Sequence, residues 1–570
     1  LANDQLSRII SMLYEINKNF INEGNPERIT VGMSHGDLPK NKRDQEQMQK
    51  YWDGGVPIKC PKCKEGYLIG LEPKLVKCLT CKEELDFVFL FQDPNFGALV
   101  DILITNPDKL IWDMMERPGH HGIFGREISC CNQCFAGYGT LLKRKCDVCS
   151  NATFEKKKPL PPRFLVFDEI HQFKGTFGTN ALYLHERLKT IFKRYAKRNF
   201  EKDWPVCSIG SSATIADAGR FAKTFFGLDE GQITVIPKDD ATKESYYEKA
   251  EGNFRKHVFL MPYRYRPAAT CGKVAGYLQA RRLIGAKSEP FSEMYDKTSD
   301  DPLQILGFVN NLGDVGELRN VVARERQDLV FEVDGHSTDY GQGDRGRAER
   351  EFNKKDVNVI FATPTLEVGV DFSTVNSVMI YGFPFSFNEY VQRIGRGGRK
   401  ENSLVVTICH RWRPIDHYYM ADARRKLSEQ HRHYEPIPIT RDNPNLILKH
   451  LIGAFWDYIS SLDDAHMLFG DIKRKLEPKV EEIGDSMFDT SVEHSPINAL
   501  GLSESEKTEY QEFLKSYITM EKGRMASSPQ QFTKKNFLYD DAKSPDRVYK
   551  LTNLRQIENS VEVELIWDVF

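Results

Sequence analysis

Eight of the 12 cysteines of the chain lie in four C-x-x-C pairs, and this pattern constrains the fold more than any other feature of the sequence. A C-x-x-C pair forms a tight turn that can point two thiolates at one metal ion, and two such turns about 10 to 20 residues apart complete a tetrahedral site. The pattern therefore predicts two metal-bound modules, at residues 56–86 and 128–152. The predicted ligands are Cys60, Cys63, Cys78 and Cys81 in the first module, and Cys131, Cys134, Cys146 and Cys149 in the second.

Zinc is the metal expected at both sites, because four thiolates in a tetrahedron are typical of structural Zn²⁺. The flanks of the first two pairs resemble the strand-and-turn arms of a zinc ribbon. Disulfides and buried free cysteines are the alternatives, and disulfides are disfavoured because the sequence shows no secretion signal. In the second module Cys130 is an alternative ligand, but the spacing to Cys134 favours Cys131.

The composition indicates a globular protein of several domains. The chain has 570 residues, 40% of them hydrophobic, with 79 Lys and Arg against 81 Asp and Glu. At about 150 residues per domain this length predicts three to four domains, and the composition excludes fibrous and wholly disordered classes. No apolar stretch approaches the roughly 18 to 20 residues of a membrane span, so we expect a cytoplasmic protein without a membrane partner. The formal net charge of −2 neither supports nor excludes a nucleic-acid partner.

An apolar run that ends in two carboxylates predicts a catalytic strand. Residues 164–167 read Phe-Leu-Val-Phe and are followed by Asp168, Glu169, Ile170 and His171. We expect a buried parallel strand that delivers both acids to its carboxyl end, where open α/β sheets bind their ligands. In a nucleotide hydrolase the first acid holds Mg²⁺ and the second activates water. A simple strand-to-loop exit is the alternative interpretation.

Three later segments accompany this strand, and the first of them is another short strand that ends in small hydroxyl residues. They are residues 207–214, residues 358–371 and residues 389–399. In the last of these, Arg396 and Arg399 are predicted to share one face of a short helix, where two guanidinium groups could clamp a phosphate. A solvated basic helix end is the alternative.

In chain order, these segments resemble the motifs of superfamily 2 DExH-box helicases. The matching segments are residues 1–5 (motif Ia), 101–110 (Ib), 168–171 (II, here called the DEIH box), 212–214 (III), 305–310 (IV), 363–371 (V) and 392–399 (VI). Within the superfamily the chain resembles the MrfA- and Lhr-like branch, which also includes helicases of DISARM-type phage defence. Residues 35–39, 174–178 and 366–371, and Asn443-Pro444 followed by His450, carry that resemblance.

The resemblance implies an α/β fold with two RecA-like parallel-sheet lobes. The first lobe would span residues 1–250 and carry both zinc-ribbon modules as insertions, and the second would span residues 255–435. Residues 436–570 would form a mainly helical accessory region. A stretch rich in Arg and Tyr, residues 263–282, corresponds to no motif.

The resemblance also implies roles for individual residues. Asp168 would hold Mg²⁺, Glu169 would activate water, and His171 would couple the site to motif III. From the second lobe, Gln392, Arg396 and Arg399 would act on the γ-phosphate. The implied ATP-binding residues are Asp168, Ser212, Thr214, Gly369 and Asp371, and the implied strand-binding residues are Asn106, Pro107, Asp108, Thr363 and Glu367.

One departure from the family concerns the phosphate loop. The pattern G-x-x-x-x-G-K-[ST] occurs nowhere in the sequence, and in the family it precedes motif Ia, with which this chain begins. Truncation is the simplest explanation, and we expect the chain as given to bind ATP poorly.

The function expected from the sequence is that of an ATP-dependent helicase or translocase. By resemblance it would move 3′ to 5′ on DNA that is single-stranded or has a single-stranded tail, in DNA repair or phage defence and with partner proteins of such a system. The expected cofactors are ATP, Mg²⁺ and two structural Zn²⁺ ions. Two alternatives remain: an RNA helicase, and a zinc-ribbon nucleic-acid binding protein without ATPase activity.

Overall fold

The structure is a computed structural model of the whole chain, and it describes a defined set of residues. These are residues 2–25, 27–35, 45, 56–64, 66–72, 75–90, 99–116, 122–133, 137–138, 145–146, 149–212, 215–236, 255–284, 304–325, 333–336, 348, 351–352, 356–363, 375–398, 402–460 and 495–513.

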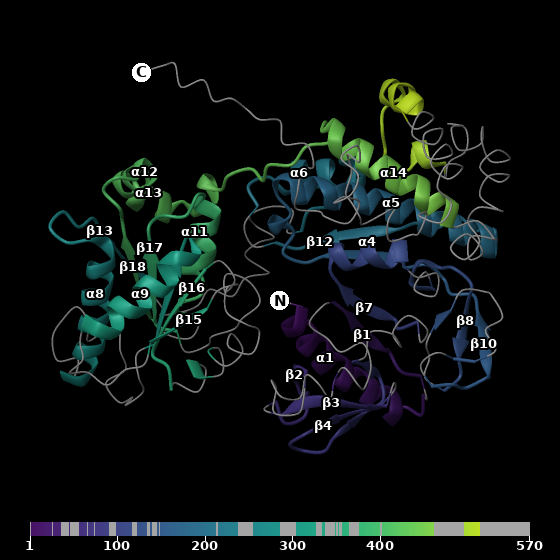
Figure 1. Cartoon of the computed structure of the whole chain (residues 1–570), viewed down its shortest axis with the longest axis horizontal. Coiled ribbons are helices and arrows are strands. Elements are labelled where there is room, and N and C mark those ends of the chain that lie inside the picture. The colour runs from purple at the N-terminus through teal and green to yellow at the C-terminus, as the bar shows by residue number, and fades with distance from the viewer. Residues whose placement is uncertain are drawn as a thin grey trace, which may run out of the picture. The chain divides into compact units, whose positions relative to one another are not determined.

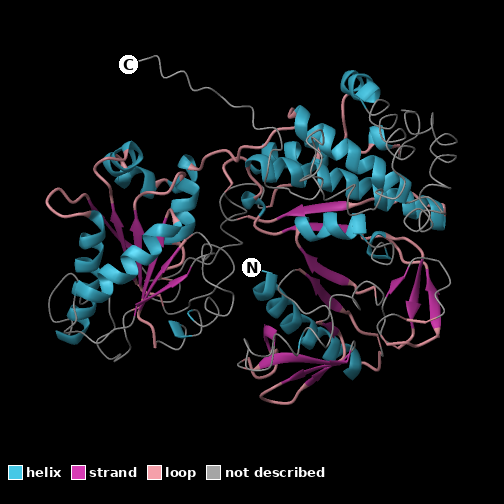
Figure 2. Cartoon of the chain, viewed as in Figure 1, coloured by secondary structure: helices cyan, strands magenta, loops and turns pink. Residues whose placement is uncertain are grey.

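The chain divides into two compact units, each with its own sheets (Figures 1 and 2). The motif VI unit comprises residues 1–5, 214–217 and 235–436. The DEIH unit comprises residues 6–213, 218–234 and 437–570. The DEIH unit is therefore built from segments on both sides of the motif VI unit in the sequence.

A six-stranded parallel sheet forms the centre of the motif VI unit. Its strand order is β13-β18-β17-β14-β16-β15. The strands are β13 (Arg255–Leu260), β14 (Ile305–Val309), β15 (Val333–His336), β16 (Val359–Ala362), β17 (Ser377–Tyr381) and β18 (Ser403–Ile408). The helices are α8 (Pro267–Ile284), α9 (Leu312–Glu325), α11 (Phe387–Ile394), α12 (Pro414–Ala421) and α13 (Ala423–Ser428), followed by the 3₁₀ turn η5 (Gln430–His433).

Helices cover both faces of this sheet, as its apolar strands require. Side chains alternate along each strand, so Ile305 and Val309 join one core with α8 and α9, while Leu306 and Phe308 join another with α11 and Tyr419 of α12. Strands buried on both faces read as continuous apolar runs, which explains the sequences of β14, β16 and β17.

The DEIH unit contains two smaller parallel sheets. One has the order β6-β1-β7, and the other pairs β11 with β12. Their strands are β1 (Val31–Ser34), β6 (Val88–Phe89), β7 (Ile102–Thr105), β11 (Phe164–Phe167) and β12 (Cys207–Gly210). The helical elements are α1 (Ala2–Asn22), α4 (Pro107–Glu116), η2 (Ile170–Gln172), α5 (Gly175–Phe200), α6 (Ala218–Phe226), η3 (Glu230–Gln232), α14 (Pro444–Ser460) and η6 (Pro496–Asn498). Parallel strands alternating with helices make an α/β fold in both units.

Two antiparallel sheets interrupt the first part of the DEIH unit. One has the order β2-β3-β4-β5 and the other β10-β8-β9. Their strands are β2 (Val56–Lys59), β3 (Tyr67–Glu72), β4 (Leu75–Cys78), β5 (Glu84–Leu85), β8 (Ile128–Cys131), β9 (Gly137–Tyr138) and β10 (Phe154–Lys157). Both sheets carry the cysteines of the two predicted modules.

The DEIH strand corrects one expectation from the sequence. β11 does pair in parallel with β12, but Phe164 is 62% exposed and Val166 is 64% exposed. Ile209, the register partner of Val166, is also exposed. The prediction of a buried strand was wrong for this face, because nothing in the part of the chain that the structure describes covers it.

None of the described helices is long and apolar enough to cross a membrane.

Candidate nucleotide site and metal centres

The end of β11 carries the DEIH box, and the neighbouring strand fixes its first acid. β11 and β12 pair with Phe167 opposite Gly210, so the residues that follow, Asp168 and Ser211, lie beside each other. The Ser211 hydroxyl donates a hydrogen bond of 2.6 Å to Oδ1 of Asp168. The parallel register therefore holds the Asp168 carboxylate at the carboxyl end of the strand, where its oxygens suit Mg²⁺.

The second acid occupies a strained backbone position. Glu169 has φ 49° and ψ 48°, a left-handed conformation that residues with a Cβ seldom adopt. Strain of this kind persists where the surrounding structure enforces it, and it is frequent at functional sites. The turn is enforced by the amide of Ile170, which donates to the Ser211 carbonyl at 2.8 Å, and by η2, which follows immediately.

His171 joins the DEIH box to the segment after β12. Its Nδ1 lies 2.9 Å from the Ser212 hydroxyl and 3.3 Å from Oε2 of Glu169, and its Nε2 lies 2.8 Å from Nε2 of Gln172. The ring is only 8% exposed, so these contacts fix its orientation. The structure thus brings together Glu169, His171 and Ser212. Thr214 lies outside the described residues.

The motif VI helix ends before Arg396. α11 ends at Ile394, and Arg396 lies in the turn that follows. The prediction that Arg396 and Arg399 share one face of a helix was therefore wrong for Arg396, because three glycines among residues 395–398 favour a turn over continued helix. Arg399 lies outside the described residues, and Gln392 lies within the last turn of α11.

The turn after α11 is held by contacts to the sheet. Arg255 of β13 donates through Nη2 to the Gly397 carbonyl at 2.9 Å, and the Gly398 amide donates to the Val375 carbonyl at 3.0 Å. Gly398 has φ 70°, a left-handed conformation that favours glycine. These contacts fix where the chain leaves the helix toward Arg399.

Sequence reasoning missed Arg393, which is more deeply buried than Arg396. Arg393 is 1% exposed and donates from Nη1 to Oδ1 of Asn310 at 2.7 Å. It thereby links the motif VI helix to the end of β14, which carries motif IV. Its position three residues after Tyr390 on an amphipathic helix was the available signal for burial.

The described residues that were predicted to bind nucleic acid follow the ends of two β-strands, β7 and β16. Asn106 follows β7, and its Oδ1 accepts from the Lys109 amide at 2.8 Å as the N-cap of α4. Pro107 and Asp108 form the first turn of α4. Thr363 follows β16 and is 6% exposed. Glu367, Gly369 and Asp371 lie outside the described residues.

The first cysteine cluster has the geometry of a tetrahedral metal site. The sulfur atoms of Cys60, Cys63, Cys78 and Cys81 all lie within 4.8 Å of one another, with Cys60 to Cys81 and Cys63 to Cys78 both at 3.6 Å. Sulfur atoms each about 2.3 Å from one zinc ion are about 3.8 Å apart, whereas a disulfide needs about 2.05 Å. Burial raises the pKa of the Cys60 thiol to about 12, a cost that a bound cation would offset. The residues fit Zn²⁺.

The same turn recurs at three of the C-x-x-C pairs. The residue after the pair has positive φ in each case: 59° at Lys64, 62° at Lys82 and 61° at Ser150. The amide of that residue donates to the carbonyl of the first cysteine, at 2.9, 3.1 and 2.9 Å. In the first cluster, amides also donate to sulfur, from Gly66 to Cys63 and from Cys81 to Cys78. These donors stabilise thiolate charge.

The second cluster brings together three of its four predicted ligands. Cys131, Cys146 and Cys149 have sulfur atoms within 4.8 Å of one another, and Cys131 to Cys149 is 3.5 Å. Cys134 lies outside the described residues. The Cys130 sulfur interacts with the Cys131 carbonyl and is not part of this group, which agrees with the choice of Cys131 as a ligand.

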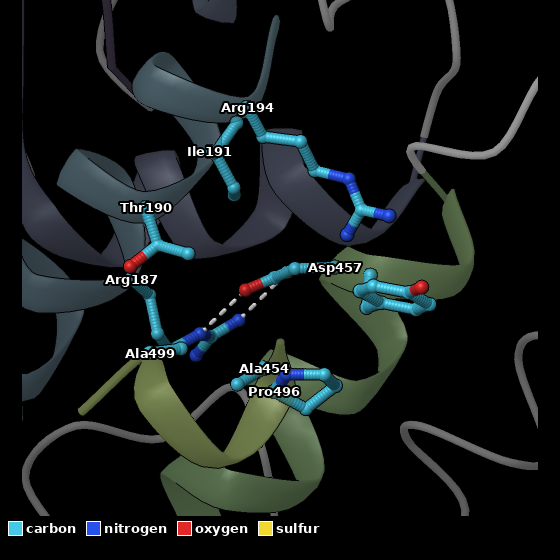
Figure 3. A pocket seen from close by; sticks show the side chains of 9 residues that line it. Arg187, Thr190, Ile191, Arg194, Ala454, Asp457, Pro496 and Ala499 are labelled. Atoms are coloured by element: carbon cyan, nitrogen blue, oxygen red, sulfur yellow. Dashed lines mark hydrogen bonds and ion pairs between the residues drawn. The ribbon is translucent and has the colours of Figure 1, made fainter. Parts of the chain in front are cut away.

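Behind the DEIH box, helix α5 is clamped to the returning C-terminal segment. The Gly175 amide at its start donates to the Pro438 carbonyl at 2.6 Å. Arg187 of α5 makes two hydrogen bonds to Asp457 of α14, at 2.7 and 3.0 Å. Figure 3 shows this pair in the pocket between α5, α14 and η6, together with Arg194. Gly453 makes room for the pair, because a Cβ there would lie 2.6 Å from Nη1 of Arg187.

Two of the four segments that carried the branch resemblance meet in this clamp, and residues 36–39 and 366–371 lie outside the described residues. Residues 174–178 start α5, Asn443 caps α14 through the Leu446 amide at 3.2 Å, and His450 lies 3.0 Å from Asn180 and 3.4 Å from Arg187. Burial lowers the pKa of His450 well below its ordinary value. The ring is therefore neutral, with Nδ1 accepting from Arg187 and Nε2 donating to Asn180.

Comparisons with known proteins agree with the motif order. Residues 287–401 match the family described as Helicase conserved C-terminal domain. The chain is 24% identical over 265 residues to the ATP-dependent helicase HRQ1 of Saccharomyces cerevisiae, a match that covers 45% of this chain and 22% of that protein. It is 21% identical over 368 residues to the DISARM protein DrmA of Bacillus paralicheniformis, covering 58% of this chain and 31% of that protein. The chain thus spans less than a third of either relative.

Among solved structures, the helicase Lhr of Mycobacterium smegmatis, bound to single-stranded DNA and AMP-PNP, is similar with a TM-score of 0.46 and 16% identity. That match covers 86% of this chain and 48% of the Lhr chain. These sequence similarities agree with the resemblance to superfamily 2 helicases that the motifs indicated.

Proposed function

We propose that this chain, as a superfamily 2 helicase of the Lhr- and MrfA-like branch, forms the motor of an ATP-dependent nucleic-acid helicase or translocase. The observation that carries the proposal is the arrangement at the end of β11. There Asp168 is held by Ser211, and Glu169 and His171 are joined to Ser212. Acids at the carboxyl end of a parallel strand are suited to nucleotide hydrolysis.

In this proposal each unit contributes part of the catalytic set. Bound Mg²⁺ would neutralise developing phosphate charge, and the Asp168 carboxylate would hold it. Glu169 would accept a proton from the attacking water, with the neighbouring His171 fixing the orientation of its carboxylate. Gln392, Arg396 and Arg399 would contact the γ-phosphate from the motif VI unit, and Ser212, Thr214, Gly369 and Asp371 would complete the ATP site.

The nucleic acid would contact loops at strand ends, through Asn106, Pro107, Asp108, Thr363 and Glu367. Because such contacts are mainly to the backbone, we expect weak sequence preference and strong salt dependence. DNA with 3′ to 5′ movement is the favoured substrate and polarity. One relative is named a DISARM protein, so phage defence, or DNA repair, with partner proteins is the proposed setting.

The two cysteine clusters would hold one structural Zn²⁺ each, the first through four cysteines and the second through Cys131, Cys134, Cys146 and Cys149. The sulfur spacing of the first cluster supports this directly. Metal analysis of protein purified without added zinc tests it. We expect two zinc ions per chain, and one in a Cys60→Ser, Cys63→Ser variant. Substantially fewer than two per chain in the unmodified protein would contradict the proposal.

ATP hydrolysis tests the main proposal. The protein, at the length at which it is naturally expressed, should hydrolyse ATP faster when single-stranded DNA is added, and Glu169→Gln should abolish turnover while leaving ATP binding intact. Glu155→Gln, on exposed β10, is the matched control and should leave turnover unchanged. Folded, zinc-loaded protein without turnover would favour the alternative of a zinc-ribbon binding protein that lacks ATPase activity. Stronger stimulation by RNA than by DNA would favour an RNA helicase.

A further inference from the structure

One edge of the motif VI unit exposes large aromatic side chains that no motif explains. They follow the carboxyl ends of β13, β17 and β18, which are neighbouring parallel strands, so these ends share one edge of the sheet. The exposed fractions are 72% for Tyr263, 60% for Tyr265, 75% for Phe385 and 61% for Trp412. We call these four residues the aromatic edge. In Figure 1 the loop after β13 and the start of α12, which follows Trp412, lie at the same end of the sheet.

Cations alternate with these rings along the sequence, and one of them, Arg413, also lies 3.4 Å from Asp416. Residues 261–273, after β13, contain Arg264, Arg266 and Lys273 and no Asp or Glu. Arg411 and Arg413 flank Trp412 after β18. Lys273 lies 5.2 Å from the centre of the Tyr265 ring, and Arg413 lies 5.9 Å from that of Phe385. Each contact brings a positive charge to the face of an exposed ring.

Hydrogen bonds hold the loops that carry the aromatic edge, and those accepted by Asp416 are buried. Asp416 is fully buried and accepts from the Phe383 amide at 3.1 Å and from the His410 amide at 2.6 Å, which joins the loops after β17 and β18. Arg413 donates to the Phe383 carbonyl at 2.9 Å, and Arg411 donates to the Tyr263 carbonyl at 3.4 Å. The rings are thus presented by a rigid support, which lowers the entropy lost on binding.

We propose that the aromatic edge binds a single strand of nucleic acid by stacking its unpaired bases on Tyr263, Tyr265, Phe385 and Trp412, while the neighbouring cations contact its phosphates. This inference rests on the proposed function and adds a strand-binding surface beyond the loops assigned above. Aromatic rings interleaved with Arg and Lys are what sequence-independent binding of single strands requires, because every base has a face to stack and every linkage a charge. Paired bases in a duplex do not offer those faces, so the surface selects single strands.

Binding to a fluorescent strand of about 20 deoxythymidines, measured by anisotropy, tests the proposal with the whole chain. Each single change among Tyr263→Ala, Tyr265→Ala, Phe385→Ala and Trp412→Ala should weaken binding about tenfold. An abasic strand of the same length should bind with nearly equal strength to the variants and the original protein, because it cannot stack. Tyr277→Ala is the matched control: Tyr277 is an exposed tyrosine on α8 of the same unit, away from the strand ends.

Two further variants separate stacking from misfolding. Trp412→Phe keeps a ring and should restore most of the binding lost in Trp412→Ala. The double variant Arg264→Ala, Arg266→Ala should weaken the binding of both the deoxythymidine and the abasic strand. The slope of the logarithm of the binding constant against the logarithm of salt concentration should become shallower by about 0.7 per cation removed. If the quadruple alanine variant binds the deoxythymidine strand within twofold of the original protein, the aromatic edge is not a binding surface, although the proposed motor stands. If the original protein binds no strand at all, both proposals fail.

Discussion

Each unit buries an arginine almost completely, and the two arginines are neutralised in different ways. Arg187 of the DEIH unit is 2% exposed and meets the Asp457 carboxylate with two hydrogen bonds. Arg393 of the motif VI unit is 1% exposed and meets the neutral amide oxygen of Asn310, with the nearest Glu389 oxygen 4.0 Å away. One guanidinium is hydrogen-bonded to a carboxylate, and the other to an amide oxygen with a carboxylate 4.0 Å away.

The second arrangement follows from what Asn310 does on its other side. Its Nδ2 donates to the carbonyls of Gly382 and Phe383 at 3.2 and 3.1 Å, which a carboxylate would repel. Asn310 therefore links motif IV, the motif VI helix and the loop that carries Phe385. Arg187 thus holds α5 against α14, whereas Arg393 positions the helix that bears Gln392.

Removing the carboxylate of the first pair should have the largest effect. Asp457→Ala leaves Arg187 buried without a counter-charge, so we expect the free energy of unfolding of the DEIH unit to fall by about 3 to 5 kcal/mol. Urea denaturation, with hydrogen exchange of α5 and α14 to locate the loss, measures it. Glu230→Ala, which removes an exposed ion pair with Lys223 in the same unit, is the control and should change stability too little to measure. Arg187→Met combined with Asp457→Leu should recover most of the loss. Unchanged stability in Asp457→Ala would show that the clamp is not compensated as described.

Giving Arg393 a carboxylate partner in place of Asn310 should destabilise the motif VI unit. Asn310→Asp supplies a charge for Arg393 but loses two donors to backbone carbonyls, and we expect the motif VI unit to lose up to about 3 kcal/mol. Hydrogen exchange of β14 and α11 should report the loss. Asn320→Asp, at an exposed position on α9 of the same unit, is the matched control. A more stable Asn310→Asp protein would overturn the explanation given for the neutral partner.

Acid should weaken the clamp of the DEIH unit through His450. In the unfolded chain the imidazole of His450 gains a proton below about pH 6.5. In the folded protein it does not, because burial and the charges of Arg187 and Lys449 lower its pKa. The stability contributed by the neutral ring is thus present above that pH and falls by about 1.4 kcal/mol per pH unit below it. Stability measured from pH 7 to pH 5 should show a steeper fall in the original protein than in His450→Gln. Equal slopes would mean that His450 is not the group responsible.

The smallest effects should come from the two helix caps that border these networks. Asn443 caps α14, and the Ser386 hydroxyl accepts from the Glu389 amide to cap α11. Alanine at either position should cost about 1 kcal/mol, in its own unit alone. Hydrogen exchange can assign each loss to a unit. If Ser386→Ala also opened α14, the two networks would not be independent.

Sequence reasoning predicted the site best where a residue's environment is set by its neighbours in the chain. The cysteine turns depend on contacts within five residues, and the strand before Asp168 depends on a run of four apolar residues. The exposure of Phe164 and Val166 was not predicted, because it depends on what packs against the strand. The end of α11 before Arg396 was missed although the three glycines that favour it stand in the sequence.

The sequence by itself determined the order of the motifs, the strands that directly precede Asp168 and Thr363, and the two sets of cysteines. Each rests on local pattern, because period, spacing and turn chemistry act between residues a few positions apart. Only the tertiary structure decided that Arg187 meets Asp457 across 270 positions, and that Arg393 meets Asn310 across 83. It also decided that three separate loops present their aromatic rings at one edge. Such pairings follow from strand order and helix packing, which leave no periodic signal in the sequence.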